Sequence, residues 1–159
     1  MRLLISLLFL ITPALAPAEE FREIDWLELM PPEEIELLEK MQDSIDHSGM
    51  MSMEQVGSSA TVLAMDGTRG KMVGYIVPIS ISSRNEILEF FLVPYFGACI
   101  HVPPPPPNQI IHVKPAQPMP MIEIWDPYWV EGTLRIRKIE NTMASASYAI
   151  DPVNVVPYQ

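Results

Sequence analysis

The chain contains only one cysteine, Cys99, among its 159 residues, which excludes an intramolecular disulfide. A fold without such a crosslink has to rest on its hydrophobic core. Basic residues are also scarce, since 10 lysine and arginine residues stand against 20 acidic ones and give a formal net charge of −10. Nucleic acids and anionic membranes attract basic surfaces, so this balance argues against both as partners. It suits a basic protein partner or a cation, or serves only solubility.

Long apolar runs are absent as well. The apolar stretch from Leu3 to Ile11 is far shorter than the ~20 residues of a membrane-spanning helix. Arg2 precedes it and the small residues Ala16 to Ala18 follow it, which predicts a secretory signal peptide over residues 1–18, cleaved near Ala18. We therefore expect a protein exported to the bacterial periplasm, with no membrane span after signal removal.

The mature chain divides into three parts. Residues 19–45 form an acidic preface, in which Pro31-Pro32 and the acidic pair Glu33-Glu34 are typical of the first turn of a helix. Ile35, Leu38 and Met41 follow at helical spacing, which predicts a short amphipathic helix with Trp26 and Leu29 as further anchors. Residues 46–60 are polar and methionine-rich and indicate a flexible linker, and residues 61–159 form a single β domain.

The methionines of the linker allow a second interpretation. His47, Met50, Met51 and Met53 offer imidazole and thioether groups that suit Cu(I). A linker that merely contains methionines is the favoured interpretation. Met119 and Met121 present the same choice.

The β domain is predicted from short segments of alternating polarity and β-branched residues. The clearest strand is Val130 to Arg137, where apolar and polar residues alternate, and Gly74 marks a bulge or bend in the strand Lys71 to Ser80. These segments favour a mainly β fold, a small antiparallel barrel of the OB-fold type. The remaining predicted strands are Thr61–Met65, Glu89–Val93, Ile110–Lys114, Met121–Ile124, Tyr148–Ile150 and Val153–Val156.

The cysteine lies in the most distinctive segment of the chain. One residue separates Cys99 from His101, and five consecutive prolines follow. Residues two apart in an extended backbone point to the same side, and prolines favour a stiff polyproline II conformation. The sequence therefore predicts a site at Cys99 and His101 on a rigid structural or interaction loop, which comprises Gly97, Pro103, Pro104, Pro105, Pro106, Pro107, Asn108 and Gln109.

Three segments of the chain resemble one bacterial family, called domain of unknown function 3299. They are DGTRGKMVGYIVPI, FFLVPYFGACIHVPPPPPNQIIHV and WVEGTLRI, and the resemblance extends from about Trp26 to the end of the chain. It implies an exported, compact β domain with no established catalytic activity. It also implies candidate partners, because relatives are often encoded beside ABC-transporter components and an exported histidine-rich protein, in gene clusters that respond to zinc limitation.

The pair Cys99 and His101 admits three interpretations. Thiolate and imidazole are zinc ligands, and His112 is a candidate third ligand, with a carboxylate or water as the fourth. Alternatively the pair is structural, with an inert buried thiol and a hydrogen-bonded imidazole. A thiol enzyme has the least support, because side chains two apart on a strand point in parallel and no second cysteine is present for a dithiol cycle. We therefore expect no enzymatic activity.

The proline segment also has two interpretations. It is either a ligand for an aromatic groove of another protein, or a brace packed on aromatic side chains of its own chain, which is the favoured interpretation. The leading functional hypothesis is a periplasmic accessory protein of a metal-responsive ABC transport system that binds zinc. The alternative is a metal-free interaction module that uses the Cys-x-His and polyproline loop. The aromatic candidates for the brace are Tyr95, Phe96, Trp125, Tyr128 and Trp129.

Overall fold

The computed structural model of the protein describes residues 21–36, 54–99 and 104–158. Several predictions fall outside this range. They concern the signal peptide 1–18, the helical positions Leu38 and Met41, the linker up to Met53, and the loop residues His101 and Pro103.

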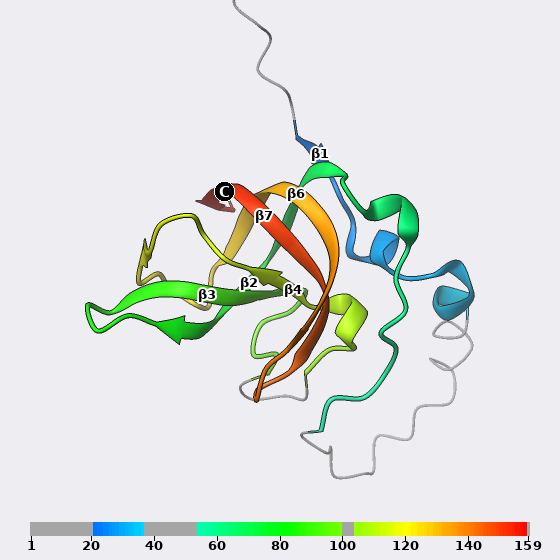
Figure 1. Cartoon of the computed structure of the whole chain (residues 1–159), viewed down its shortest axis with the longest axis horizontal. Helices are drawn as coiled ribbons and strands as arrows, with labels where there is room; N and C mark the ends of the chain where they lie inside the picture. Colours follow the sequence, from blue (N-terminus) through cyan, green and yellow to red (C-terminus); the bar gives the residue numbers. More distant parts are fainter. Residues whose placement is uncertain (1–20, 37–53, 100–103, 159) are drawn as a thin grey trace, which may run out of the picture.

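The chain folds around one mixed β-sheet. Its strands follow the order β1-β2-β6-β7-β4-β3-β5, and β2 also pairs with β3. Because β2 has β6 on one side and β3 on the other, the sheet curls into a partial ring (Figure 1). The strands are β1 (Arg22–Glu23), β2 (Arg69–Ile81), β3 (Glu86–Val93), β4 (Ile111–Val113), β5 (Met119–Pro120), β6 (Pro127–Glu140) and β7 (Ser145–Pro157).

The side-chain alternation of the strands builds the main core inside the curl. In β6, Tyr128, Val130 and Leu134 are buried while the residues between them are partly exposed, as the alternating sequence predicts. Their side chains meet Phe90 and Leu92 from β3 in one apolar cluster. Burial of such side chains contributes about 1.5–3 kcal/mol each and is the main stabilising term in a chain without disulfides.

A second, smaller apolar cluster lies on the other face of β3. Phe91 and Val93 alternate with Phe90 and Leu92, so their side chains point away from the main core. Ala98 and Ile110, from the segments before and after the proline run, cover them. This central strand is therefore buried on both faces, and the segment that carries Cys99 is part of its cover.

The structure confirms the mainly β class but corrects parts of the prediction. The sheet is not wholly antiparallel, because β4 runs parallel to β7 and β1 runs parallel to β2. Both of these pairings join segments far apart in the sequence, which alternation within one strand cannot orient.

Two predicted strands are absent from the described residues. Met121–Ile124 is not a strand, because the short strand β5 ends before it at Pro120. Thr61–Met65 is not a strand: Leu63–Met65 form a 3-10 turn, and Tyr148 accepts the Val62 N–H through its hydroxyl at 2.7 Å. The two segments predicted near the C-terminus form one strand, β7, which continues through Pro152 beside a bulge between Glu131 and Gly132.

The N-terminal segment packs on the ring as predicted. Trp26 donates its indole N–H to the Val73 carbonyl at 2.8 Å, and Leu29 is fully buried. Both residues lie in a 3-10 turn, Trp26–Leu29, that Asp25 and Glu28 close with a reciprocal capping box. Residues 32–36 are helical, and no helix in the described part of the chain is long and apolar enough to cross a membrane.

Gly74 is required for a close approach rather than for the predicted bulge. Its pairing with β6 is regular, but an added Cβ would lie 2.6 Å from the Val93 carbonyl oxygen. We expect Gly74→Ala to lower the free energy of unfolding by about 1–3 kcal/mol through overpacking. Urea denaturation of the protein from residue 19 onward measures this change. Ser83→Ala, on the exposed β2–β3 hairpin, is the control; equal midpoints for the two variants would contradict the close approach.

Candidate functional site

The backbone at the predicted Cys-x-His site turns sharply before the proline run. Gly97 and Cys99 both have positive φ, 82° and 64°, and Cys99 is one of two non-glycine residues with positive φ among those described. The left-handed conformation is costly for a side chain with a Cβ, so the surrounding packing has to hold it. Ala98, between them, is fully buried and supplies that packing.

Cys99 is half-buried against the second apolar cluster. Burial raises the pKa of its thiol to about 11, because the thiolate loses solvation there. Near neutral pH the group is therefore a neutral thiol. A neutral thiol is a poor nucleophile, so without a bound metal ion Cys99 has the reactivity of a packed structural cysteine.

His112, the candidate third ligand, has another partner. Its Nε2 lies 3.1 Å from a carboxylate oxygen of Glu89, and its ring packs edge-on against Phe91. The other oxygen of Glu89 accepts a hydrogen bond from Lys114 at 2.8 Å. Lys114 first, and then His112, lower the pKa of Glu89. His112 is thus buried on β4, with its ring nitrogen on the carboxylate that pairs with Lys114.

These placements bear on the zinc interpretation. In residues 21–36, 54–99 and 104–158, no group of three or more histidine, cysteine, aspartate or glutamate side chains could hold a metal ion. His101 lies outside these ranges, so the set Cys99, His101 and His112 stays a prediction.

The proline loop turns inward. Pro104 and Pro105 are buried, although Tyr95 and Phe96 are exposed. Prolines have no N–H to donate, so neighbouring polar side chains make the hydrogen bonds that hold this segment. Gln109 donates to the Trp26 carbonyl at 3.0 Å.

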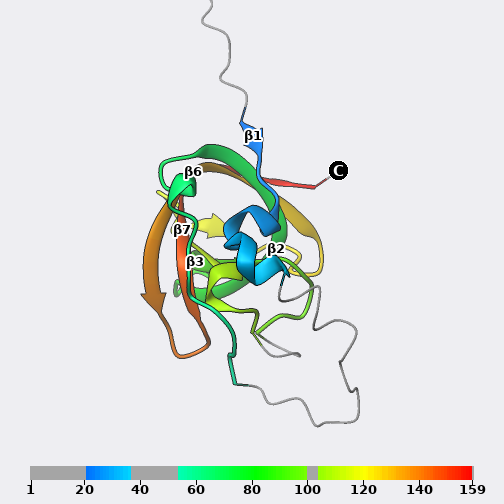
Figure 2. The ribbon, with the colours of Figure 1, turned by 90° about the vertical axis from the view of Figure 1, so that its right-hand side faces the viewer.

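Asn108 connects the loop to two further segments. Its buried amide donates to Glu34 at 2.8 Å and to the Ala60 carbonyl at 3.1 Å, and Glu34 also bonds to Ser58. The amide oxygen of Asn108 has no partner among the described residues. Figure 2 shows the N-terminal helical residues, in blue, beside the loop at residues 104–110, in yellow-green.

Gln55 is a loop contact that the sequence does not reveal. Its amide nitrogen donates to the carbonyls of Pro105 and Ser145, both at 2.9 Å, and its oxygen accepts the Ser145 N–H at 2.7 Å. It lies in the predicted linker 46–60, which from Glu54 onward runs along the ring without helix or strand. A glutamine in a polar segment carries no pattern that predicts contacts 50 and 90 residues away.

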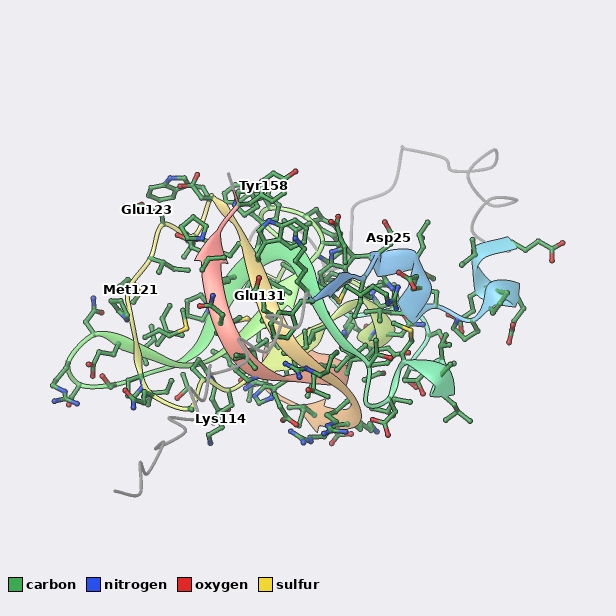
Figure 3. All side chains as sticks on the ribbon, turned by 90° about the horizontal axis from the view of Figure 1, so that it is seen from above. Asp25, Lys114, Met121, Glu123, Glu131 and Tyr158 are labelled. Atoms are coloured by element: carbon green, nitrogen blue, oxygen red, sulfur yellow. The ribbon has the colours of Figure 1, made fainter. Side chains whose placement is uncertain are left out.

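A second site, which the sequence did not predict, is an apolar groove of about 550 Å³. One wall is the segment after β4, with Met119, Pro120 and Ile122, and the other is the end of β7, with Val153 and Val155. The buried Tyr128 of β6 closes the groove toward the main core. Figure 3 shows the wall with Met121 and Glu123, in yellow, across from β7, in red, which leads to Tyr158.

The groove exists because the sheet splits at this point. The pairing of β4 with β7 begins at Ile111 and Tyr148 and ends at Val113 and Ile150. Beyond Ile150, β7 keeps only β6 as its paired neighbour. On the other side of the split, β5 pairs with the start of β3 and not with β7. The groove occupies the space between β5 and β7, and its size is that of a small-ligand or side-chain pocket.

Comparison with known proteins identifies the family. The model of the family described as "Protein of unknown function (DUF3299)" matches residues 26–157. The chain belongs to this family. It is also similar to the crystal structure of a DUF3299 family protein from Pseudomonas aeruginosa PAO1, with 38% sequence identity, a TM-score of 0.71, and coverage of 87% of this chain and 97% of that chain. No curated protein matches the chain.

Membership in the DUF3299 family confirms the predicted resemblance. The matched region includes both the proline loop and the groove, and begins at Trp26, whose indole is bonded to β2. The family description names no activity, ligand or partner, so the function has to be argued from the two sites themselves.

The raised pKa of Cys99 predicts slow alkylation. At about pH 8 the folded protein should hold about 100-fold less thiolate than the unfolded chain, whose thiol titrates near 9.0. Iodoacetamide labelling, followed by mass spectrometry, should be correspondingly slower in buffer than in urea. The folded state binds the proton of the Cys99 thiol more tightly than the unfolded chain does. The contribution of this thiol to the free energy of unfolding is therefore complete below pH 9.0 and is lost as the pH rises through about 11.

A relocated thiol controls for this labelling experiment. The double variant Cys99→Ala, Ser83→Cys places the thiol on the exposed hairpin and should react at the rate of an unfolded chain. Native labelling of Cys99 as fast as that of the relocated thiol would show that it is an accessible, reactive group.

Gln55 should contribute to stability through its three hydrogen bonds. We expect Gln55→Ala to lower the free energy of unfolding by about 1–3 kcal/mol, because the Ser145 N–H and two carbonyls lose their partner. Gln117→Ala, at an exposed glutamine, is the matched control and should stay within about 0.5 kcal/mol of the native protein. Equal chemical denaturation curves for the two variants would show that the hydrogen bonds of Gln55 do not stabilise the fold.

Proposed function

We propose that this protein is a non-enzymatic binding module that takes an apolar ligand or partner group into the groove between β5 and β7. The groove itself carries the proposal. It is concave, mostly apolar and open to the surface, and its exposed margin includes the large side chains Met121, Trp125 and Val153. Apolar surface of this kind is costly to leave in water and marks binding sites in soluble proteins.

The chemistry of the available groups supports a binding role. Tyr128 is the titratable side chain that lines the groove, and burial raises its pKa, so it stays protonated near neutral pH. Cys99 is likewise a neutral thiol, and it packs on the second apolar cluster rather than in the groove. Among the residues that the structure describes, neither group has the base and orienting partner that nucleophilic catalysis requires.

An OB-fold-like barrel is part of the proposal. Its support is the circuit of pairings from β2 to β6, β7, β4 and β3 and back to β2. Small barrels of this class bind ligands on strand faces and the adjoining loops. The groove lies beside such a loop, at residues 115–122.

The proposed setting is the periplasm, reached through the signal peptide over residues 1–18. The resemblance to families encoded beside ABC transporters makes exported or membrane components of such a system the candidate partners. Zinc binding through Cys99, His101 and His112 has less support, because Glu89 already occupies the Nε2 atom of His112. The alternative, docking through the Cys-x-His and polyproline loop, also has less support than the groove, since Pro104 and Pro105 are buried.

Binding of the neutral fluorescent probe N-phenyl-1-naphthylamine to the protein from residue 19 onward tests the groove. We expect saturable binding with one site per chain. Val153→Arg should weaken it about tenfold or more, because a charged side chain at the mouth opposes apolar burial. Val153 is exposed, so this variant should fold.

The control variant for the probe experiment is Leu63→Arg. Leu63 is an exposed apolar residue on the 3-10 turn before β2, away from the groove. Its substitution should leave probe binding unchanged. Absence of saturable binding, or an equal loss in both variants, would contradict the proposed function.

A further inference from the structure

The walls of the groove are poor in hydrogen-bond donors. Pro115, Pro120, Pro152 and Pro157 line it and have no N–H. The Val155 N–H is also taken, because it donates to the side-chain oxygen of Asn154 at 3.1 Å. An occupant of this groove therefore finds a mostly apolar surface, with the side chains of Gln117, Tyr128 and Asn154 as the polar groups of its lining.

The margin of the groove is acidic. Glu123 and Asp126 are exposed and flank the wall that leads from Ile122 to Tyr128, and a turn bond of 3.3 Å from the Asp126 N–H to the Glu123 carbonyl holds them close together. Neither carboxylate forms an ion pair within the described part of the chain. Both charges act on the Tyr128 hydroxyl and raise its pKa, in addition to burial.

The basic groups nearest to the groove do not neutralise this margin. Lys114, directly before Pro115, is paired with Glu89 at 2.8 Å. Arg135 and Arg137 both bind Asp151, directly before Pro152, at 3.1 and 3.5 Å. The net charge of −10 adds to the negative potential at longer range.

Apolar surface also continues beyond the groove. Met121 and Trp125, on the segment that also carries the wall residue Ile122, are large apolar side chains with 39% and 60% of their surface exposed. Neither belongs to the lining of the groove, so a small molecule held there would leave them in water. Exposed tryptophan beside a pocket is typical of protein–protein contacts, and its ring attracts cations.

Resting on the proposed function of the groove, we infer that its occupant is a short apolar segment of a partner protein that carries lysine or arginine beside its apolar residues. Apolar side chains enter the groove, and the cationic groups bind the carboxylates of Glu123 and Asp126 at its margin. Addition of the segment as a further strand on β7 does not fit, because Pro152, Pro157 and the occupied Val155 N–H remove the donors that a ladder needs.

Displacement of N-phenyl-1-naphthylamine by three synthetic peptides tests this inference. The peptides, acetylated and amidated, have the sequences KLVPLVK, ELVPLVE and KSSPSSK. We expect KLVPLVK to displace the probe at a concentration about tenfold lower than ELVPLVE, and KSSPSSK to displace none, because both apolar burial and charge are needed. The advantage of KLVPLVK should disappear between about 0.01 M and about 1 M salt, as screening shortens the Debye length from about 30 to about 3 Å.

A variant without the two carboxylates tests whether they cause the preference for the cationic peptide. Glu123→Gln with Asp126→Asn should reduce the preference for KLVPLVK over ELVPLVE to about threefold or less. Glu33→Gln with Glu140→Gln removes the same number of charges elsewhere and should keep most of the preference, which separates the margin from the net charge.

The possible failures are distinguishable. Saturable probe binding with equal displacement by KLVPLVK and ELVPLVE would overturn the inference and leave the proposed function standing. Displacement by dodecyltrimethylammonium but by none of the peptides would assign the groove to a small cationic amphiphile and overturn the partner segment. Absence of probe binding would overturn both proposals.

Discussion

The early end of strand β4 is the constraint on which the rest of the structure depends. β4 ends at Val113, and Pro115 follows with no N–H to continue the ladder. β7 therefore loses this neighbour after Ile150, while β6 stays paired with it as far as Pro157. The segment after β4 forms a wall instead of a strand. One proline, two residues after the end of a strand, thus opens the sheet at a point where the main core would otherwise be covered.

Prolines before β4 have the opposite effect and fix its position. Pro104 and Pro105 are buried, and Gln55, Asn108 and Gln109 tie the loop to the N-terminal segment and to β7. β4 is therefore held from its first residue by groups that do not belong to the sheet. A groove whose walls are fixed in this way is formed before its occupant arrives, so binding costs little conformational entropy.

The sequence predicts the parts of this protein that depend on local pattern. The strand around Val130 is predictable because its apolar and polar residues alternate in the same way as its buried and partly exposed residues. Thr61–Met65 has β-branched and apolar residues too, but it forms no ladder with a neighbouring strand, and the Val62 N–H donates to the Tyr148 hydroxyl instead. The groove could not be predicted for a related reason. Its walls are 30 to 40 residues apart in the chain, and the parallel register of β4 on β7 that brings them together leaves no periodic signal.

The described part of the Cys-x-His segment shows which features of this motif have structural roles. Prolines have no N–H, so a run of them cannot donate hydrogen bonds to the carbonyl groups around it. Asn108 and Gln109, directly after the run, donate to the carbonyls of Ala60 and Trp26 instead. The reversal before the run requires a left-handed turn, which Gly97 and the closely packed Ala98 and Cys99 provide. In that packing the thiol loses solvation and its pKa is raised, which lowers the reactivity of this lone cysteine. The segment most conspicuous in the sequence therefore holds β4 in place, and the surface available for binding lies beyond the other end of the same strand.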